Sequence, residues 1–280
     1  MEKDPLKGTG TGRETGIADL RTGAGGAGAD PAVAGGPDGQ ADGRGGSGAG
    51  GPVPGDPSVM SSVRAPERPL PDDRLFLGFT HAPLAALGPG LRAGVWTCGC
   101  DLGCPGCVAP ELQAAGPEDA VPAADLAAWA AATVRDGGLS GLTVSGGEPF
   151  YRPEALRIFL ELCREGGVGD VLVYSGRRAG ELVEAFPWVP ELVTALVDGP
   201  FEEGRPSSRP WKGSEGQTLT VFAGGQLARL YAAWEASEEW PLQMVAFPEG
   251  VVRILGIPKI GTYDSISLGR DPCGPGGRDG

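Results

Sequence analysis

The chain has 280 residues, of which 50 are glycine and 27 proline, and its formal net charge is −13. Nucleic-acid binding requires clustered Lys and Arg to neutralise phosphates, and the sequence has no such patch, so we expect no nucleic-acid partner. A single histidine, His81, permits a Ser-His-Asp triad only if that one residue serves it. We interpret it as a surface or packing residue.

Residues 1–70 are rich in Gly, Ala, Pro, Asp and Arg, and eighteen of the 50 glycines lie before residue 61. Because this segment has almost no large apolar side chains, burial cannot offset a backbone entropy cost of about 1–2 kcal/mol per ordered residue. The composition therefore predicts a disordered leader. We find no apolar run typical of a secretory signal and no stretch long enough to span a membrane, so we expect a cytoplasmic protein without membrane attachment.

Past residue 70 the apolar periodicity alternates between strand and helix. Strands are expected at 91–96, 142–145, 171–174, 193–197 and 218–222, helices at 123–136, from Pro153 onward, at 179–186 and at 226–237, and a closing hairpin at 242–257.

Strands that alternate with helices predict an α/β fold with right-handed βαβ units and a parallel sheet. The expected domain spans residues 71–262, followed by a flexible tail at 263–280. A full eight-unit barrel takes about 250 residues, so this domain is too short for one. We expect an incomplete, laterally open (β/α) barrel.

Cys100, Cys104 and Cys107 form a C-x3-C-x2-C pattern directly after the first expected strand. Three cysteines in one short loop can bind three irons of a cubane cluster and leave the fourth iron without a protein ligand. Gly103 and Gly106 permit the turns that such a loop needs. In a chain with no expected export the thiols should be reduced, which suits a [4Fe-4S] cluster with one iron open to a small molecule.

Two other interpretations of the cysteines remain. A structural zinc site could add Cys98 to the three, although zinc prefers C-x2-C pairs that are separated by a longer spacer. A ferredoxin-like electron carrier needs a fourth cysteine ligand, and Cys98 is separated from Cys100 by only one residue. We predict no role for Cys98 or Cys273, and we expect Cys163 to face the core.

A second motif, Gly146-Gly147-Glu148-Pro149, follows at the end of the next expected strand. The functional loops of parallel α/β folds lie at the carboxyl ends of the strands, and a right-handed crossover makes this motif a neighbour of the cysteine loop. Ser175 and Asp198 end the third and fourth strands at the same edge. They are candidate ligand contacts or, equally, turn residues.

Together the two motifs resemble those of the radical S-adenosylmethionine (SAM) enzymes, whose signature is C-x3-C-x2-C after the first strand and GGEP after the second. The segments 88–96, 173–176, 196–201 and 211–214, with Gln217, further resemble the anaerobic ribonucleotide reductase-activating proteins, a branch of the glycyl-radical activases. The resemblance covers roughly residues 73–262.

The resemblance implies that a [4Fe-4S] cluster on the three cysteines binds SAM at its open iron and cleaves it to a 5′-deoxyadenosyl radical. That radical would take a hydrogen atom from a glycine of a partner glycyl-radical enzyme, and flavodoxin or ferredoxin would supply the electron. The implied ligands of the cluster are Cys100, Cys104 and Cys107, and the residues expected to bind SAM are Gly146, Gly147, Glu148, Pro149, Ser175 and Asp198.

The sequence departs from the activase pattern at two places. Residues 108–111 lack the Asn and Trp that commonly follow the last cysteine, and residues 213–217 lack the Asn of the family's Gly-Ser-x-Asn-Gln segment. These departures leave two rivals open. One is a radical SAM enzyme that modifies a peptide or small metabolite, and the other is a non-catalytic, zinc-stabilised binding module.

Overall fold

The computed structural model of the chain describes residues 70–247 and 252–259. The predicted leader up to residue 69, the turn of the predicted hairpin and the predicted tail at 263–280 lie outside the described residues. Among those described, no helix has both the length and the apolar character needed to cross a membrane.

The order of strands and helices follows the predicted alternation closely. The strands are β1 (Arg74–Leu84), β2 (Arg92–Thr97), β3 (Ala120–Pro122), β4 (Gly141–Gly146), β5 (Val171–Ser175), β6 (Ala195–Asp198), β7 (Thr218–Val221), β8 (Gln243–Ala246) and β9 (Val252–Leu255). The α-helices are α2 (Ala123–Asp136), α3 (Pro153–Glu165), α4 (Ala179–Ala185), α5 (Val189–Leu192) and α6 (Gly225–Glu235), with short 3-10 turns at Pro110–Leu112, Pro117–Asp119 and Pro149–Tyr151.

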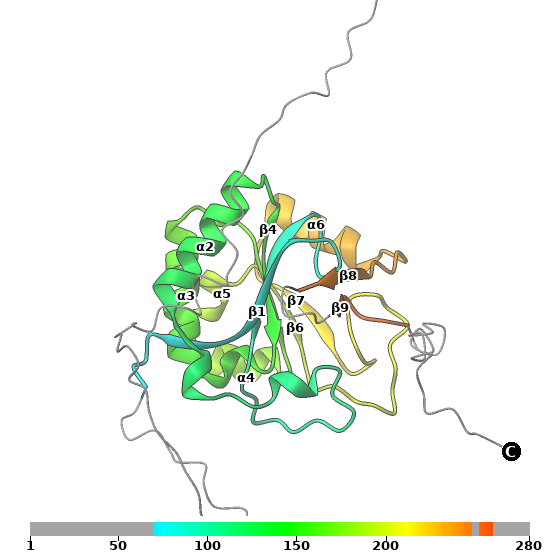
Figure 1. Cartoon of the computed structure of the whole chain (residues 1–280). Coiled ribbons are helices and arrows are strands. Elements are labelled where there is room, and N and C mark those ends of the chain that lie inside the picture. The colour runs from blue at the N-terminus through cyan, green and yellow to red at the C-terminus, as the bar shows by residue number, and fades with distance from the viewer. Residues whose placement is uncertain (1–69, 248–251, 260–280) are drawn as a thin grey trace, which may run out of the picture. The chain divides into compact units, whose positions relative to one another are not determined.

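Seven strands form one sheet in the order β3-β1-β2-β4-β5-β6-β7 (Figure 1). The central strands β2, β4, β5 and β6 are parallel, as the βαβ pattern predicts, while β1, β3 and β7 pair antiparallel at the two sides. The α/β class is therefore confirmed, and the sheet is mixed rather than wholly parallel. The long strand β1 was not predicted, because Gly78 and Pro83 interrupt its apolar alternation.

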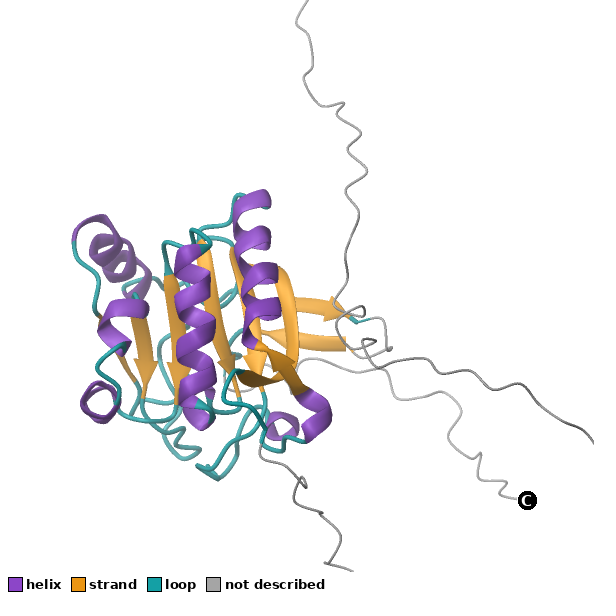
Figure 2. Cartoon of the chain, turned by 90° about the vertical axis from the view of Figure 1, so that its left-hand side faces the viewer, coloured by secondary structure: helices purple, strands orange, loops and turns teal. Residues whose placement is uncertain are grey.

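Alternate residues of each strand face two different layers, as the period of two in a strand requires. In β5, Val171 and Val173 pack in the core beneath α2, α3 and α5, whereas Leu172 packs on the opposite face with Tyr231 of α6. Figures 1 and 2 show α2 and α3 side by side along one face of the sheet. Cys163 of α3 is fully buried in that core, as predicted.

The predicted closing hairpin is confirmed as the antiparallel pair β8 and β9, which forms a separate two-stranded sheet (Figure 2). Gln243 fastens it to the end of β1, since its Nε2 donates to the carbonyl of Pro83 at 2.9 Å and its Oε1 accepts from the amide of Ala85 at 3.1 Å. His81 also packs here, with its Nε2 3.0 Å from Gln243 Nε2, and burial lowers the pKa of its imidazole.

A fully buried guanidinium ties the amino ends of the central strands together. Arg92 Nη1 lies 2.7 Å from Asp170 Oδ2, its Nε donates to Thr143 Oγ1 at 2.7 Å, and its Nη2 donates to the carbonyl of Leu142 at 2.8 Å. The Tyr231 hydroxyl donates to the other Asp170 oxygen at 2.8 Å, and burial raises the pKa of that phenol. The network joins β2, β4, the entrance of β5 and α6.

Asp170→Asn tests this network, because it leaves the Arg92 charge buried without its counter-ion. We expect the free energy of unfolding in urea to fall by about 3–5 kcal/mol. The matched control is Asp136→Asn, which breaks the exposed pair with Arg135 and should cost less than about 1 kcal/mol. Equal losses for the two variants would contradict a stabilising role of the buried pair.

Candidate functional site

A cavity of about 660 Å³ lies against the face of the sheet opposite α2 and α3. Its volume is in the range of small-molecule sites. Trp96 and Tyr174 form part of its wall, and Val95 and Val173, their neighbours in the chain, face the other layer. The remaining lining comes from the cysteine loop (Cys100, Leu102, Cys104, Cys107–Ala109, Glu111–Gln113), the ends of β4 and β5 (Ser145–Gly147, Ser175, Gly176), Phe79, Leu87, Phe201, Gly213, Gln217 and residues 252–258.

All three cysteines of the motif line this cavity. Cys100, Cys104 and Cys107 are free thiols of intermediate exposure, and burial raises the pKa of Cys100. Gly103 and Gly106 have φ values of 60° and 65°, the left-handed conformation that favours glycine. Over residues 70–247 and 252–259, no three His, Cys, Asp or Glu side chains converge on one metal ion. The three thiolate ligands of a cubane bind separate irons and need not converge on one point, so three cysteines that line one cavity are compatible with such a cluster.

The GGEP segment is joined directly to the base of the cysteine loop by backbone hydrogen bonds. The amide of Gly147 donates to the carbonyl of Thr97 at 2.8 Å, and the amide of Glu148 donates to the carbonyl of Gly99 at 2.9 Å. A Cβ on Gly146 would lie 2.1 Å from the Thr97 carbonyl oxygen. The glycines are therefore needed because two loops approach closely, a reason that the sequence motif alone does not reveal.

The carboxylate of Glu148 lies behind the cavity wall and does not line it. One oxygen accepts from the amide of Phe150 and from Ser175 Oγ, both at 2.9 Å, and the other accepts from the amide of Gly176 at 2.9 Å. Burial raises the pKa of this carboxyl, and these hydrogen bonds oppose the shift. Glu148 thus fixes the end of β5 against the end of β4.

The other predicted site residues also divide into those that line the cavity and those that lie behind its wall. Ser175 lines the cavity with Gly146 and Gly147. Pro149 is buried at the start of its 3-10 turn. Asp198 accepts from Thr218 Oγ1, Thr220 Oγ1 and the amide of Ala179, at 2.8, 3.1 and 3.1 Å, and so fastens β6 to β7 and α4.

Several contacts that hold the cavity together were not predicted. Arg177 Nη2 binds both oxygens of Asp101, at 2.7 and 2.8 Å, and so connects the end of β5 to the cysteine loop. Gln217 Oε1 accepts from the amide of Gly213 at 2.8 Å and its Nε2 donates to the carbonyl of Gly199 at 3.0 Å. The segments at 173–176, 196–201 and 211–217, which resemble those of the activating proteins, therefore lie close together. Their proximity depends on the topology of the fold and is not visible in the sequence.

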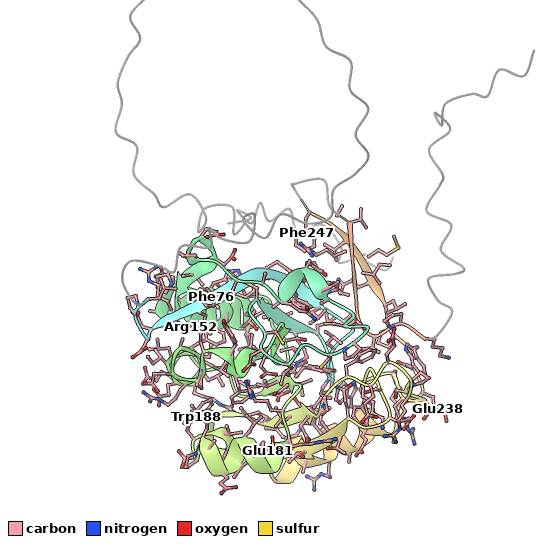
Figure 3. The ribbon with its side chains drawn as sticks, turned by 90° about the horizontal axis from the view of Figure 1, so that it is seen from below. Phe76, Arg152, Glu181, Trp188, Glu238 and Phe247 are labelled. Carbon is pink, nitrogen blue, oxygen red and sulfur yellow. The ribbon has the colours of Figure 1, made fainter. Side chains whose placement is uncertain are left out.

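A cluster of side chains surrounds the 3-10 turn Pro149–Tyr151, which begins at the last residue of GGEP. Arg152 donates through Nε to the carbonyl of Arg74 at 2.7 Å, and its guanidinium lies over the ring of Phe76. Figure 3 shows Phe76 and Arg152 next to each other and Trp188 farther along the same region. Trp188 and Phe150 stack with ring centroids 5.8 Å apart. These contacts tie β1 to the segment that carries the motif.

Comparison with known proteins matches a region that contains most of the cavity lining, but neither Phe79 nor residues 252–258. Residues 86–220 match the family model of the 4Fe-4S single cluster domain. The anaerobic ribonucleoside-triphosphate reductase-activating protein of Salmonella typhi is 30% identical over 146 residues, which cover 47% of this chain and 89% of that protein. The protein of the same name from Escherichia coli (strain K12) is 28% identical over 138 residues, with the same coverage. The matched model contains both motifs and ends before α6, β8 and β9.

Gly147→Ala tests the close approach of the two loops. The added Cβ would lie 2.5 Å from the Gly99 carbonyl oxygen and 2.6 Å from that of Leu112, so the backbone must shift, and we expect a loss of about 1–3 kcal/mol in unfolding free energy. Gly180→Ala is the control, because its Cβ meets nothing within 4 Å inside α4. It should be neutral or stabilising by up to about 1 kcal/mol. Equal behaviour of the two variants would contradict the packing constraint.

Proposed function

The chain belongs to the family of the anaerobic ribonucleoside-triphosphate reductase-activating proteins, and from this membership and the cavity we propose that it is a radical SAM enzyme that installs a glycyl radical on a partner enzyme. One observation carries the proposal. A single cavity is lined by the three cysteines of the loop together with Gly146, Gly147 and Ser175.

Cys100, Cys104 and Cys107 would hold a [4Fe-4S] cluster as thiolates, in agreement with the family model that covers them. When bound, such a cluster supplies the electron that splits SAM into methionine and a 5′-deoxyadenosyl radical. The loop supports this donor set, since the backbone of Cys100 is fixed by donation of its amide to the carbonyl of Gln113 at 2.9 Å. The Asp101–Arg177 pair holds the next residue.

Of the residues expected to bind SAM, we assign direct contacts with SAM to those that line the cavity. We assign to those behind the cavity wall the role of positioning the contact residues. The exposed backbone of Gly146 and Gly147 offers carbonyl acceptors for the ammonium of SAM, and a hydrogen bond to a charged group contributes about 1.5–3 kcal/mol. Ser175 can contact the ligand while its hydroxyl is oriented by Glu148. Pro149 and Asp198 act through the backbone that they fix.

The sheet supports the same assignment. It runs from β3 to β7, and the cavity lies at the carboxyl ends of the parallel strands β2, β4 and β5. We propose that this is the laterally open barrel of radical SAM enzymes. Its rim carries Val108, which is 70% exposed and directly follows the last cysteine of the motif. An apolar rim suits a loop of another protein, with a flavodoxin or ferredoxin as the outside source of the electron.

The test is anaerobic reconstitution with iron, sulfide, SAM and a strong reductant. We expect about four irons per chain and release of 5′-deoxyadenosine, and Cys104→Ala should lose most of the release because one thiolate ligand is missing. Cys163→Ala is the matched control, since that cysteine is buried in the core away from the cavity. It should keep both cluster and product. Product formation unaffected by Cys104→Ala would contradict the assignment.

The partner is tested by adding the anaerobic ribonucleoside-triphosphate reductase of the source organism to the same mixture. We expect the doublet signal of a glycyl radical in the reductase, measured by electron paramagnetic resonance, with wild-type chain and not with Cys104→Ala. Release of 5′-deoxyadenosine without any radical on the reductase would favour the rival, a radical SAM enzyme that acts on a peptide or metabolite. One tightly bound zinc per chain and no product would favour the binding module.

A further inference from the structure

Arg253 stands out among the residues that form the cavity. It lies in β9, whose residues form one side of the cavity, and it follows the region matched by the family model, which ends at residue 220. Within the described part of the chain, no other Lys or Arg lines the cavity, and Glu111 is the one acidic residue that does. Arg253 is therefore the one positively charged side chain that the described lining offers to a ligand, and it lies beside Glu111.

Aromatic rings hold that guanidinium in place. Its central carbon lies 4.5 Å from the ring centroid of Phe79 and 5.4 Å from that of Phe247, which follows β8 and is labelled in Figure 3. Phe79 is itself stacked on Trp96, with ring centroids 4.4 Å apart. Such contacts attract the cation to the ring faces and fix its orientation before any ligand arrives. Arg253 is thus a preorganised cation.

The hydrogen-bonding capacity of Arg253 is largely unused. A guanidinium carries five N–H donors. In the described part of the chain its one hydrogen bond runs from Nη1 to Glu111 Oε1 at 3.5 Å, and its Nε is buried with no partner. Arg177, by contrast, binds both oxygens of Asp101. The side chain is 23% exposed, so the donors on Nη1 and Nη2 that no residue of the described chain uses are available to an acceptor that arrives with a ligand.

We propose that Arg253 binds a carboxylate in the cavity, an inference that rests on the proposed function. A guanidinium matches a carboxylate through two parallel hydrogen bonds. A polyphosphate is a poorer fit, because its several charges would meet one cation with Glu111 beside it. Under the proposed reaction SAM brings its methionyl carboxylate to this site, and an acidic side chain beside the substrate glycine is the other candidate. Arg253 serves as a binding residue for one of them.

Arg253→Gln in the reconstituted holoprotein tests the proposal by equilibrium dialysis with SAM and with decarboxylated SAM. If the methionyl carboxylate is bound, SAM affinity falls about 10- to 100-fold, the range for a hydrogen bond to a charged group, and affinity for decarboxylated SAM stays within about twofold. Arg253→Lys should recover part of the affinity because it keeps the charge. Arg229→Gln, an exposed arginine of α6 outside the cavity, is the matched control and should change neither affinity.

The second arm measures glycyl-radical formation on the anaerobic reductase at varied reductase concentration. If the carboxylate belongs to the polypeptide, Arg253→Gln raises KM for the reductase about tenfold or more, keeps kcat within about threefold and leaves SAM affinity unchanged. The proposal is overturned if SAM affinity, KM for the reductase and kcat all stay near wild type. It is also overturned if the affinities for SAM and for decarboxylated SAM fall equally, because that result would indicate a purely structural residue. Should the wild-type holoprotein release no 5′-deoxyadenosine, the proposed function fails, while the dialysis comparison still decides whether Arg253 binds the methionyl carboxylate.

Discussion

The candidate site depends on one junction between two stretches of backbone. The amides of Gly147 and Glu148 donate to the carbonyls of Thr97 and Gly99, where β2 ends and the cysteine loop begins. This junction sets the position of the loop relative to the end of β4, and Glu148 extends it to the end of β5 through Ser175 and Gly176. Three strand ends are therefore held as one unit around the cavity, as a site for a cluster and its ligand requires.

Most of the fold could be predicted because apolar residues recur along the chain with the period of a helix or of a strand. The apolar spacing of α3, with Pro153 at its first turn and glycines after its last, predicts the helix that is present. Strand β1 was missed because glycine and proline break its alternation, and its partner β3 is only three residues long. Antiparallel pairing of β7 also escaped prediction, since direction depends on the connection after β6 and not on the strand's own residues.

The residues predicted for the site lie near one cavity, but the sequence did not reveal which of them line it. The three cysteines, the two glycines and Ser175 line one cavity, but Glu148, Pro149 and Asp198 lie behind the wall, because their oxygens or rings are used to fix backbone. Arg253 could not be recognised beforehand. No motif surrounds it, and its proposed role rests on contacts with two phenylalanines and a glutamate from other parts of the chain. Spacing predicted which cysteines line the cavity together, whereas burial and satisfied hydrogen bonds show which of the other residues lie behind its wall.

The central claim is that the cavity holds a cubane with one iron free to bind SAM. Electron paramagnetic resonance of the anaerobically reduced holoprotein, recorded with and without SAM, tests this most directly. The account predicts the signal of a reduced [4Fe-4S] cluster whose line shape changes when SAM is added, because SAM occupies the free iron. A cluster signal that SAM leaves unaltered, or protein that takes up zinc and no cluster, would contradict it.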